Sequence, residues 1–216
     1  MNSGTDIFYK QVKINELEGV VKTHQAAFKD YFLTNLGDKF LFRFYKEFLE
    51  DKDTIAIGAY VQEKLVGFIL CSKNKNHVMD KFYQKNFWFI IRNVIIQTLK
   101  MNKIIISGLI SRFKLGIGVI KSLLFPNNIQ PDANNTEIST AHNTRLLSIA
   151  VLPQYQGTGA SKGMMSFFHN YLMEDNVNAV GLSVKKENTR AIKFYEKMGW
   201  QVEKKERNAI YFVKTF

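Results

Sequence analysis

Residues 146–161 read LLSIAVLPQYQGTGAS, and this run predicts three successive elements. Leu146 to Val151 has the length and apolar character of a buried strand, and Pro153 ends it. A turn with two glycines follows, and Thr158 to Met173 has the spacing of a helix. A strand, a glycine turn and a helix together present free backbone N–H groups at a helix N-terminus. The run therefore predicts a ligand that carries phosphate.

The bulk composition fits one globular domain with a core. The chain has 216 residues, of which 46% are apolar and 23% are charged. Its single cysteine, Cys71, excludes an internal disulfide and fits a reducing compartment. Cys71 ends an apolar run, which favours a buried thiol over a nucleophile. Residues 1–11 lack the apolar segment of a signal peptide, so we expect a cytoplasmic protein.

Positive charge is concentrated in the middle of the chain. The formal net charge is +11, which favours an anionic partner such as nucleic acid, a membrane surface or a phosphorylated ligand. Between residues 75 and 125, nine Lys and Arg residues are offset only by Asp80. The excess charge is therefore a property of this segment more than of the whole surface.

Hydrophobic spacing predicts an alternation of strands and helices on both sides of the basic segment. Helices are expected at 15–28, with Asn15 near the cap, and at 38–50, 158–173 and 189–198. Residues 28–32 read as an aromatic loop. Strands are expected at 8–14, 54–61, 64–72, 146–151, 179–184, 201–203 and 209–213, with 54–72 forming a hairpin.

The segment from 74 to 142 is predicted to be a helical insert. Residues 86–100 and 104–125 are helix-like and apolar, and 129–141 reads as a polar loop. Arg92, Arg112 and Lys114 fall in the middle of the apolar stretches and argue against membrane spans. Three interpretations remain open for this insert: helices packed on the domain, a wall of a substrate pocket, or contact of 86–125 with an anionic membrane surface.

A second informative run, residues 188–200, reads NTRAIKFYEKMGW. Asn188 suits a helix N-cap and Gly199 suits the residue after the helix. Ala191, Tyr195 and their neighbours at helical spacing line one face. Spacing alone favours Tyr195 as a core residue.

The two runs together resemble the GNAT superfamily of acyl-CoA-dependent N-acyltransferases. Gln156, Gly159 and Ser161 fit its motif Q/R-x-x-G-x-G/A, with serine at the last position and Gly157 as an intervening residue. Residues 188–200 fit N-x-x-A-x-x-F-Y-x-x-x-G-F/W. The resemblance implies an α+β fold with a mixed, mostly antiparallel sheet of about seven strands flanked by helices. The whole chain, 1–216, would be one such domain that carries the insert 74–142.

The resemblance also implies acetyl-CoA as co-substrate, with no metal. The pyrophosphate would bind the backbone of 156–161, the strand 149–151 would polarise the thioester carbonyl, and Asn188 would contact the pantetheine arm. Tyr195 would act as general acid. The departing thiolate, whose thiol has a pKa of about 8.5, leaves more readily when a nearby group donates a proton, and a phenol with a pKa of about 10 can do so. The implied site residues are Ile149, Ala150, Val151, Gln156, Gly157, Thr158, Gly159, Ala160, Ser161, Asn188, Ala191 and Tyr195.

The general base and the acceptor are less constrained. His142, Ser148 and Glu187 lie near the right elements, and Ser183 stands where some family members carry a glutamate. A water chain is a further alternative. The oligomeric state is open, a dimer included.

We expect transfer of an acetyl group to the primary amine of a small molecule, and inserts of this kind suggest an amino sugar of surface-polysaccharide biosynthesis. The alternatives are acetylation of a protein N-terminus or lysine, and a non-catalytic acyl-CoA sensor. Nucleic acid is not expected as a partner, because the charges of the insert alternate with aliphatic side chains.

Overall fold

The computed structural model describes residues 6–100, 103, 104, 106 and 143–216. Within them, seven strands form one mixed sheet in the order β1-β2-β3-β4-β5-β7-β6. Only the β4–β5 pair is parallel. The predicted α+β architecture is confirmed. The strands are β1 (Phe8–Gln11), β2 (Thr54–Val61), β3 (Lys64–Ser72), β4 (Arg145–Val151), β5 (Ala179–Lys185), β6 (Gln201–Lys205) and β7 (Ala209–Thr215).

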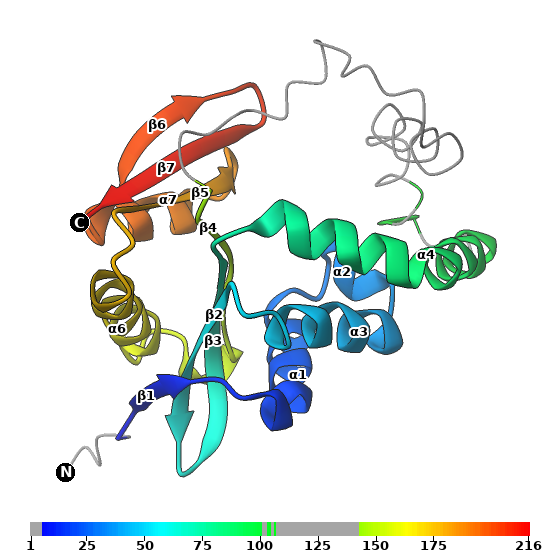
Figure 1. Ribbon diagram of the computed structural model, residues 1–216, viewed down its shortest axis with the longest axis horizontal. Coiled ribbons are helices and arrows are strands. Elements are labelled where there is room, and N and C mark those ends of the chain that lie inside the picture. Colours follow the sequence, from blue (N-terminus) through cyan, green and yellow to red (C-terminus); the bar gives the residue numbers. More distant parts are fainter. Residues whose placement is uncertain (1–5, 101–102, 105, 107–142) are drawn as a thin grey trace.

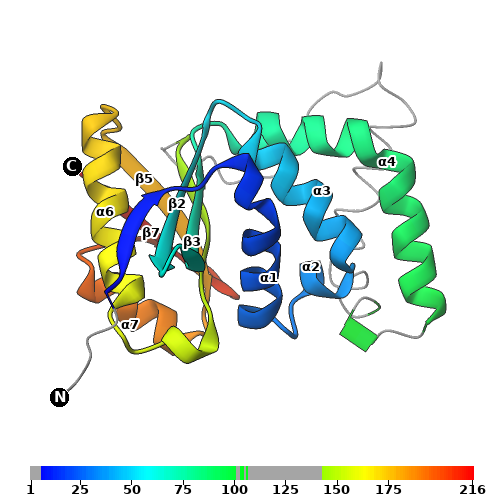
Figure 2. The ribbon, with the colours of Figure 1, turned by 90° about the horizontal axis from the view of Figure 1, so that it is seen from below.

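Helices cover both faces of the sheet (Figures 1 and 2). On one face lie α1 (Leu17–Ala27), α2 (Phe32–Asn35), α3 (Asp38–Leu49) and α4 (Lys75–Leu99). On the other lie α6 (Ala160–Glu174) and α7 (Thr189–Lys197). The hairpin β2–β3 is buried on both faces, which is why its sequence is almost continuously apolar. Each face of this hairpin therefore belongs to a different hydrophobic cluster.

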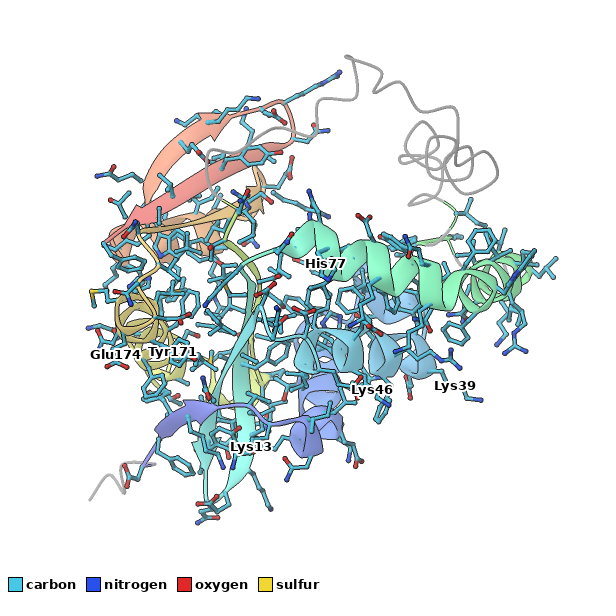
Figure 3. The ribbon with its side chains drawn as sticks, in the orientation of Figure 1. Lys13, Lys39, Lys46, His77, Tyr171 and Glu174 are labelled. Carbon is cyan, nitrogen blue, oxygen red and sulfur yellow. The ribbon has the colours of Figure 1, made fainter. Side chains whose placement is uncertain are left out.

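The helix α3 shows how the sequence separates a core face from a solvent face. Tyr45 and Phe48 are buried against the sheet and α1, and Phe40, at helical spacing from them, is buried against α4. Lys39 and Lys46 point away from the sheet into solvent (Figure 3). This is the pattern that predicted the helix, and its observed bounds differ from the prediction by one residue.

Several local boundaries differ from the predictions, and three places show why. The first strand ends at Gln11, and a 3-10 turn, Ile14–Glu16, precedes α1. Glu16 closes that turn by accepting a hydrogen bond from the Lys13 N–H at 2.8 Å, so Asn15 is not the cap. The aromatic loop is followed by α2, a single helical turn that the pattern missed. The helix α6 begins at Ala160, two residues late, because Gly159 precedes it in the left-handed conformation.

The described part of the basic insert is a helix that docks on α3. Glu47 is buried on α3, and its carboxylate oxygens lie 3.3 Å from Lys81 Nζ and 3.0 Å from Lys85 Nζ of α4. Burial alone would raise the pKa of Glu47, but hydrogen bonds and charge from the two lysines outweigh it and lower the pKa. Asn93 Nδ2 also donates to the Leu36 carbonyl at 2.6 Å. These contacts agree with the interpretation of the insert as helices packed on the domain.

The second half of α4 is different in character. Trp88 and Leu99 keep 80% and 77% of their surface exposed, so packing on α3 does not cover them. Among the described helices, none combines the length and apolar character that a membrane span needs. Most of the second predicted helix, 104–125, and the whole predicted loop, 129–141, lie outside the described residues.

Two partly enclosed imidazoles make the fold sensitive to acid. His24 on α1 is 5% exposed, and its Nδ1 lies 2.6 Å from the Tyr45 hydroxyl. Its Nε2 is buried and has no hydrogen-bond partner in the part of the chain that the structure describes. Burial lowers the pKa of His24 to about 4, and burial together with the Lys214 charge lowers the pKa of His169 to about 4. Both side chains are therefore neutral in the folded protein at neutral pH.

We expect the free energy of unfolding to fall as the pH drops from 7 to 5. In this window the unfolded histidines, with an ordinary pKa of about 6.5, bind protons that the folded ones do not. Each should contribute about 1–2 kcal/mol of the loss. Chemical denaturation at both pH values measures it. His24→Gln should remove about half of the loss, whereas His77→Gln, at an exposed position of α4, should remove none. If His24→Gln lost as much free energy of unfolding between pH 7 and pH 5 as the native protein, the assignment of this loss to His24 would be wrong.

Candidate functional site

The sheet opens between β4 and β5. These parallel strands pair only at Arg145 and Gly181, where the Gly181 N–H donates to the Thr144 carbonyl at 3.0 Å. Beyond this point each strand continues for several residues without its neighbour. A bulge contributes to the separation, because Leu70 pairs with Ser148 while Cys71 pairs with Leu146, which leaves Leu147 unmatched. The two strands therefore diverge toward their carboxyl ends.

The edge of β4 at this opening presents backbone groups. The Leu152 N–H points to β3, where it donates to the Val66 carbonyl at 2.8 Å. Since successive N–H groups of a strand alternate in direction, those of Val151 and Ile149 point to the opening, and that of Ala150 points to β3. The resemblance implies Ile149, Ala150 and Val151 as site residues. Two of them, Ile149 and Val151, therefore offer a backbone N–H donor at the place where β5 has moved away from β4.

The loop after β4 forms an open cradle at the start of α6. Gly157 and Gly159 have φ values of +85° and +92°, a region that other residues rarely adopt. A Cβ at either position would meet no atom of the described residues within 4 Å, so these residues leave the space above the two glycines open. Among the described residues, no acceptor binds the N–H groups of Ala160, Ser161 and Lys162 in the first turn of α6. The cradle is therefore a helix N-terminus with free donors.

The starts of α6 and α7 are both electropositive. Neither helix has an acidic residue in its first turn, although acidic residues are favoured there. Lys162 and Arg190 occupy these turns instead. Two helix dipoles and two cations at the carboxyl ends of β4 and β5 favour a ligand with several negative charges.

A hydrogen bond joins the two motifs across the opening. Arg190 Nη1 donates to Gln156 Oε1 at 2.9 Å, and Gln156 Nε2 lies 3.5 Å from the Val151 carbonyl. Sequence reasoning missed Arg190, although a cation in the first turn of a predicted helix was a readable signal. The Asn188 side chain accepts from the Ala191 N–H at 3.1 Å, which confirms the predicted N-cap.

Tyr195 lies inside the cluster between the sheet, α6 and α7. It is 4% exposed and packs against the rings of Trp200 and Phe212. Burial raises the pKa of its hydroxyl, so the phenol stays protonated and can donate. Among the described residues, its hydroxyl has no hydrogen-bond partner. The prediction of a core tyrosine and that of a proton donor are therefore compatible.

The base candidates differ in their surroundings. Ser148 of β4 interacts with the Tyr45 hydroxyl and partly opposes the rise in its pKa that burial causes, and this hydroxyl lies 2.6 Å from His24 Nδ1. Glu187 and Ser183 are exposed, and His142 lies outside the described residues. Cys71 is fully buried, and burial raises the pKa of its thiol, in agreement with the predicted inert role. Ser148 is thus the candidate that the structure connects to other titratable groups.

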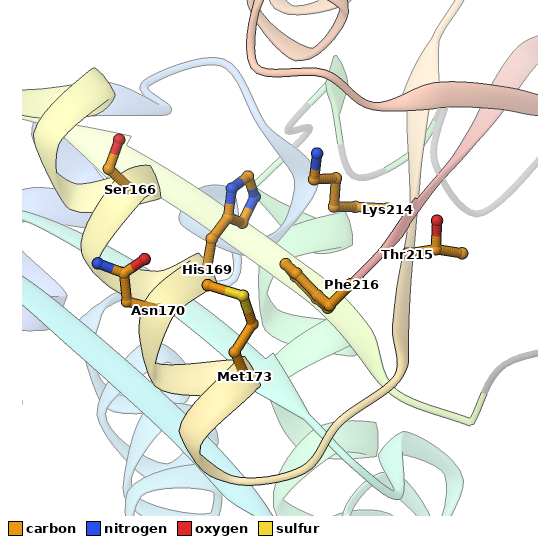
Figure 4. Close-up of a pocket in the computed structure, with 7 residues that line it drawn as sticks. All are labelled: Ser166, His169, Asn170, Met173, Lys214, Thr215 and Phe216. Atoms are coloured by element: carbon orange, nitrogen blue, oxygen red, sulfur yellow. The ribbon is translucent and has the colours of Figure 1, made fainter.

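A separate surface hollow lies between the second half of α6 and the end of β7 (Figure 4). It contains none of the predicted site residues. It is lined by Ser166, His169, Asn170, Met173, Lys214, Thr215 and Phe216.

The comparisons with known proteins agree with this geometry. The model of the acetyltransferase (GNAT) family matches residues 117–200, a range that contains both motifs. A search of curated proteins finds no match in sequence.

Solved structures share the fold at low sequence identity. The PaiA N-acetyltransferase from Thermoplasma acidophilum, solved with coenzyme A, has a TM-score of 0.53, 12% identity and coverage of 98% and 99% of the two chains. The ribosomal-protein-S18-alanine N-acetyltransferase from Escherichia coli has a TM-score of 0.56 and 12% identity, with coverage of 97% of this chain and 94% of that one. NAA60 of Arabidopsis thaliana, solved with a bisubstrate analogue, has a TM-score of 0.54 and 16% identity, with coverage of 97% of this chain and 98% of that one. The chain therefore shares the fold of these solved acetyltransferases, and residues 117–200, which carry both motifs, are similar in sequence to the GNAT family.

Proposed function

We propose that the protein transfers an acetyl group from acetyl-CoA to the primary amine of a small molecule. The observation that carries this proposal is the empty cradle of free N–H groups at the start of α6, at the mouth of the opening between β4 and β5. A pyrophosphate suits the cradle, and an extended arm suits the opening. The coenzyme A in the T. acidophilum relative supports this ligand.

In this mechanism the thioester lies beside the free edge of β4. The Val151 N–H donates to the carbonyl oxygen and stabilises the negative charge that develops there. The amine nitrogen attacks the carbonyl carbon, a C–N bond forms, and a base takes a proton from nitrogen. As the C–S bond breaks, Tyr195 gives its proton to the leaving thiolate. The amide and CoA are the products.

Release of free thiol tests this function. The full chain is incubated with acetyl-CoA and three classes of acceptor: small amines including amino sugars, peptides with free N-termini or lysines, and no amine. We expect thiol release that depends on a small amine. Release with peptides alone would favour protein acetylation. Binding of acetyl-CoA without release in any class would favour an acyl-CoA sensor, and absence of binding would contradict the proposal altogether.

A further inference from the structure

Arg145 occupies the closed end of the opening between β4 and β5. It is the first residue of β4 and pairs with Gly181, the last point at which the two strands meet. Leu146, Val180 and Leu182 belong to the cluster beneath α6, so alternation directs Arg145 and Gly181 to the opposite face of the sheet. There, a Cβ on Gly181 would collide with Arg145 Nη1. The guanidinium therefore lies directly over the glycine.

One nitrogen of the half-buried Arg145 guanidinium is enclosed without an acceptor among the described residues. Its Nη1 is buried and has no hydrogen-bond partner, and Arg145 has no ion pair within the described residues. Burial lowers the pKa of Arg145, and the charge of Glu203 acts in the opposite direction. The Arg145 Cζ atom lies 6.0 Å from the centre of the Tyr211 ring. A buried guanidinium donor without a partner is rare unless a ligand supplies the acceptor.

Charged groups of both signs lie around the face of the sheet that carries Arg145. Lys185 shares its face of β5, and its Nζ lies 5.5 Å from the centre of the Tyr31 ring, which comes from the loop before α2. Glu206 approaches this face and hydrogen-bonds the Tyr211 hydroxyl at 3.3 Å. Neither Glu206 nor Glu203 forms an ion pair with Arg145 among the described contacts.

We propose that Arg145 binds an oxyanion of the acceptor, a carboxylate or a phosphate, and selects acceptors that carry one. This rests on the proposed function. With phosphate groups at the start of α6, the thioester enters from the carboxyl ends of β4 and β5 and the acceptor lies beyond it, toward Arg145. Ile149 follows Arg145 by four residue steps, about 13 Å along β4 at 3.3 Å per residue. A short acceptor spans this distance.

Matched pairs of amines test this selection. The pairs are phosphoethanolamine and ethanolamine, glucosamine 6-phosphate and glucosamine, and β-alanine and its amide, so phosphate and carboxylate are tested separately. We expect kcat/KM to be at least about tenfold higher for the charged member of one pair. Arg145→Gln should abolish this preference, with kcat/KM for the neutral member within about threefold and the KM for acetyl-CoA unchanged.

Two further variants separate the position of the guanidinium from its charge. Gly181→Ala keeps Arg145 but displaces its head, so it should reduce the same preference. Lys185→Gln removes one charge from the same face at an exposed position and should change the preference less than about threefold. Equal preference in the native protein and in both Arg145→Gln and Gly181→Ala would overturn the proposal, as would a native preference for neutral amines.

A binding measurement decides the question if no amine of the panel reacts. Inorganic phosphate and acetate are titrated separately into protein saturated with CoA. Binding of either ion that is lost in Arg145→Gln and in Gly181→Ala, while CoA affinity persists, supports the proposal. Absence of such binding overturns it. Failure of CoA itself to bind would instead contradict the proposed function, so the two failures are distinguishable.

Discussion

Tyr195→Phe should lower turnover about 10- to 1000-fold and leave the KM for acetyl-CoA within about twofold. The change removes only the hydroxyl, and in the proposed mechanism this group acts when the thiolate leaves. The ring, which packs on Trp200 and Phe212, is kept. Because the hydroxyl has no protein partner among the described residues, the free energy of unfolding should not decrease. Steady-state kinetics and chemical denaturation measure both quantities.

Tyr171→Phe is the matched control. Tyr171 lies on α6, half-buried against the same cluster, and has no role in the proposed reaction (Figure 3). Its turnover should equal that of the native protein. Unchanged turnover in Tyr195→Phe would remove Tyr195 from the mechanism and leave the thiolate to depart unassisted.

Gly159→Ala should weaken acetyl-CoA binding about 10- to 100-fold, with a smaller effect on kcat. A side chain at φ +92° strains the backbone, and its Cβ would occupy the empty space in which we place the pyrophosphate. Loss of one or two charge-assisted hydrogen bonds costs about 1.5–3 kcal/mol, which corresponds to this range of affinity. Calorimetric titration with acetyl-CoA measures the effect.

Gly37→Ala controls for the strain. Gly37 precedes α3 in the position that Gly159 holds before α6, and its φ of +91° is almost the same. Both variants should lose about 1 kcal/mol or more of stability, but only Gly159→Ala should lose affinity. Equal affinity in the two variants would place the pyrophosphate elsewhere.

The features that the sequence predicted well depend on local patterns. The hairpin β2–β3 was predicted to the residue, because each strand is almost continuously apolar and the turn between them is short and polar. The Asn188 cap was predicted because asparagine suits this position, and its side chain accepts from the Ala191 N–H. Both motifs were readable for the same reason, since strand, glycine turn and helix cap are encoded within a few residues.

The features that escaped prediction depend on contacts between distant segments. The bulge at Leu147 exists only relative to β3, and the separation of β4 from β5 appears only when the pairing is known. The bond between Arg190 and Gln156 joins residues 34 positions apart. The sequence analysis did not single out Arg145, because its position over Gly181 follows from the parallel pairing of β4 with β5.

A crystal structure with CoA bound tests the assignment of the site most directly. The proposed site predicts pyrophosphate oxygens within hydrogen-bond distance of the N–H groups in the first turn of α6. It also predicts the pantetheine arm between β4 and β5, with the sulfur near the Tyr195 hydroxyl and the Val151 N–H. CoA bound elsewhere, or a sulfur directed away from both groups, would contradict the proposed site and its mechanism.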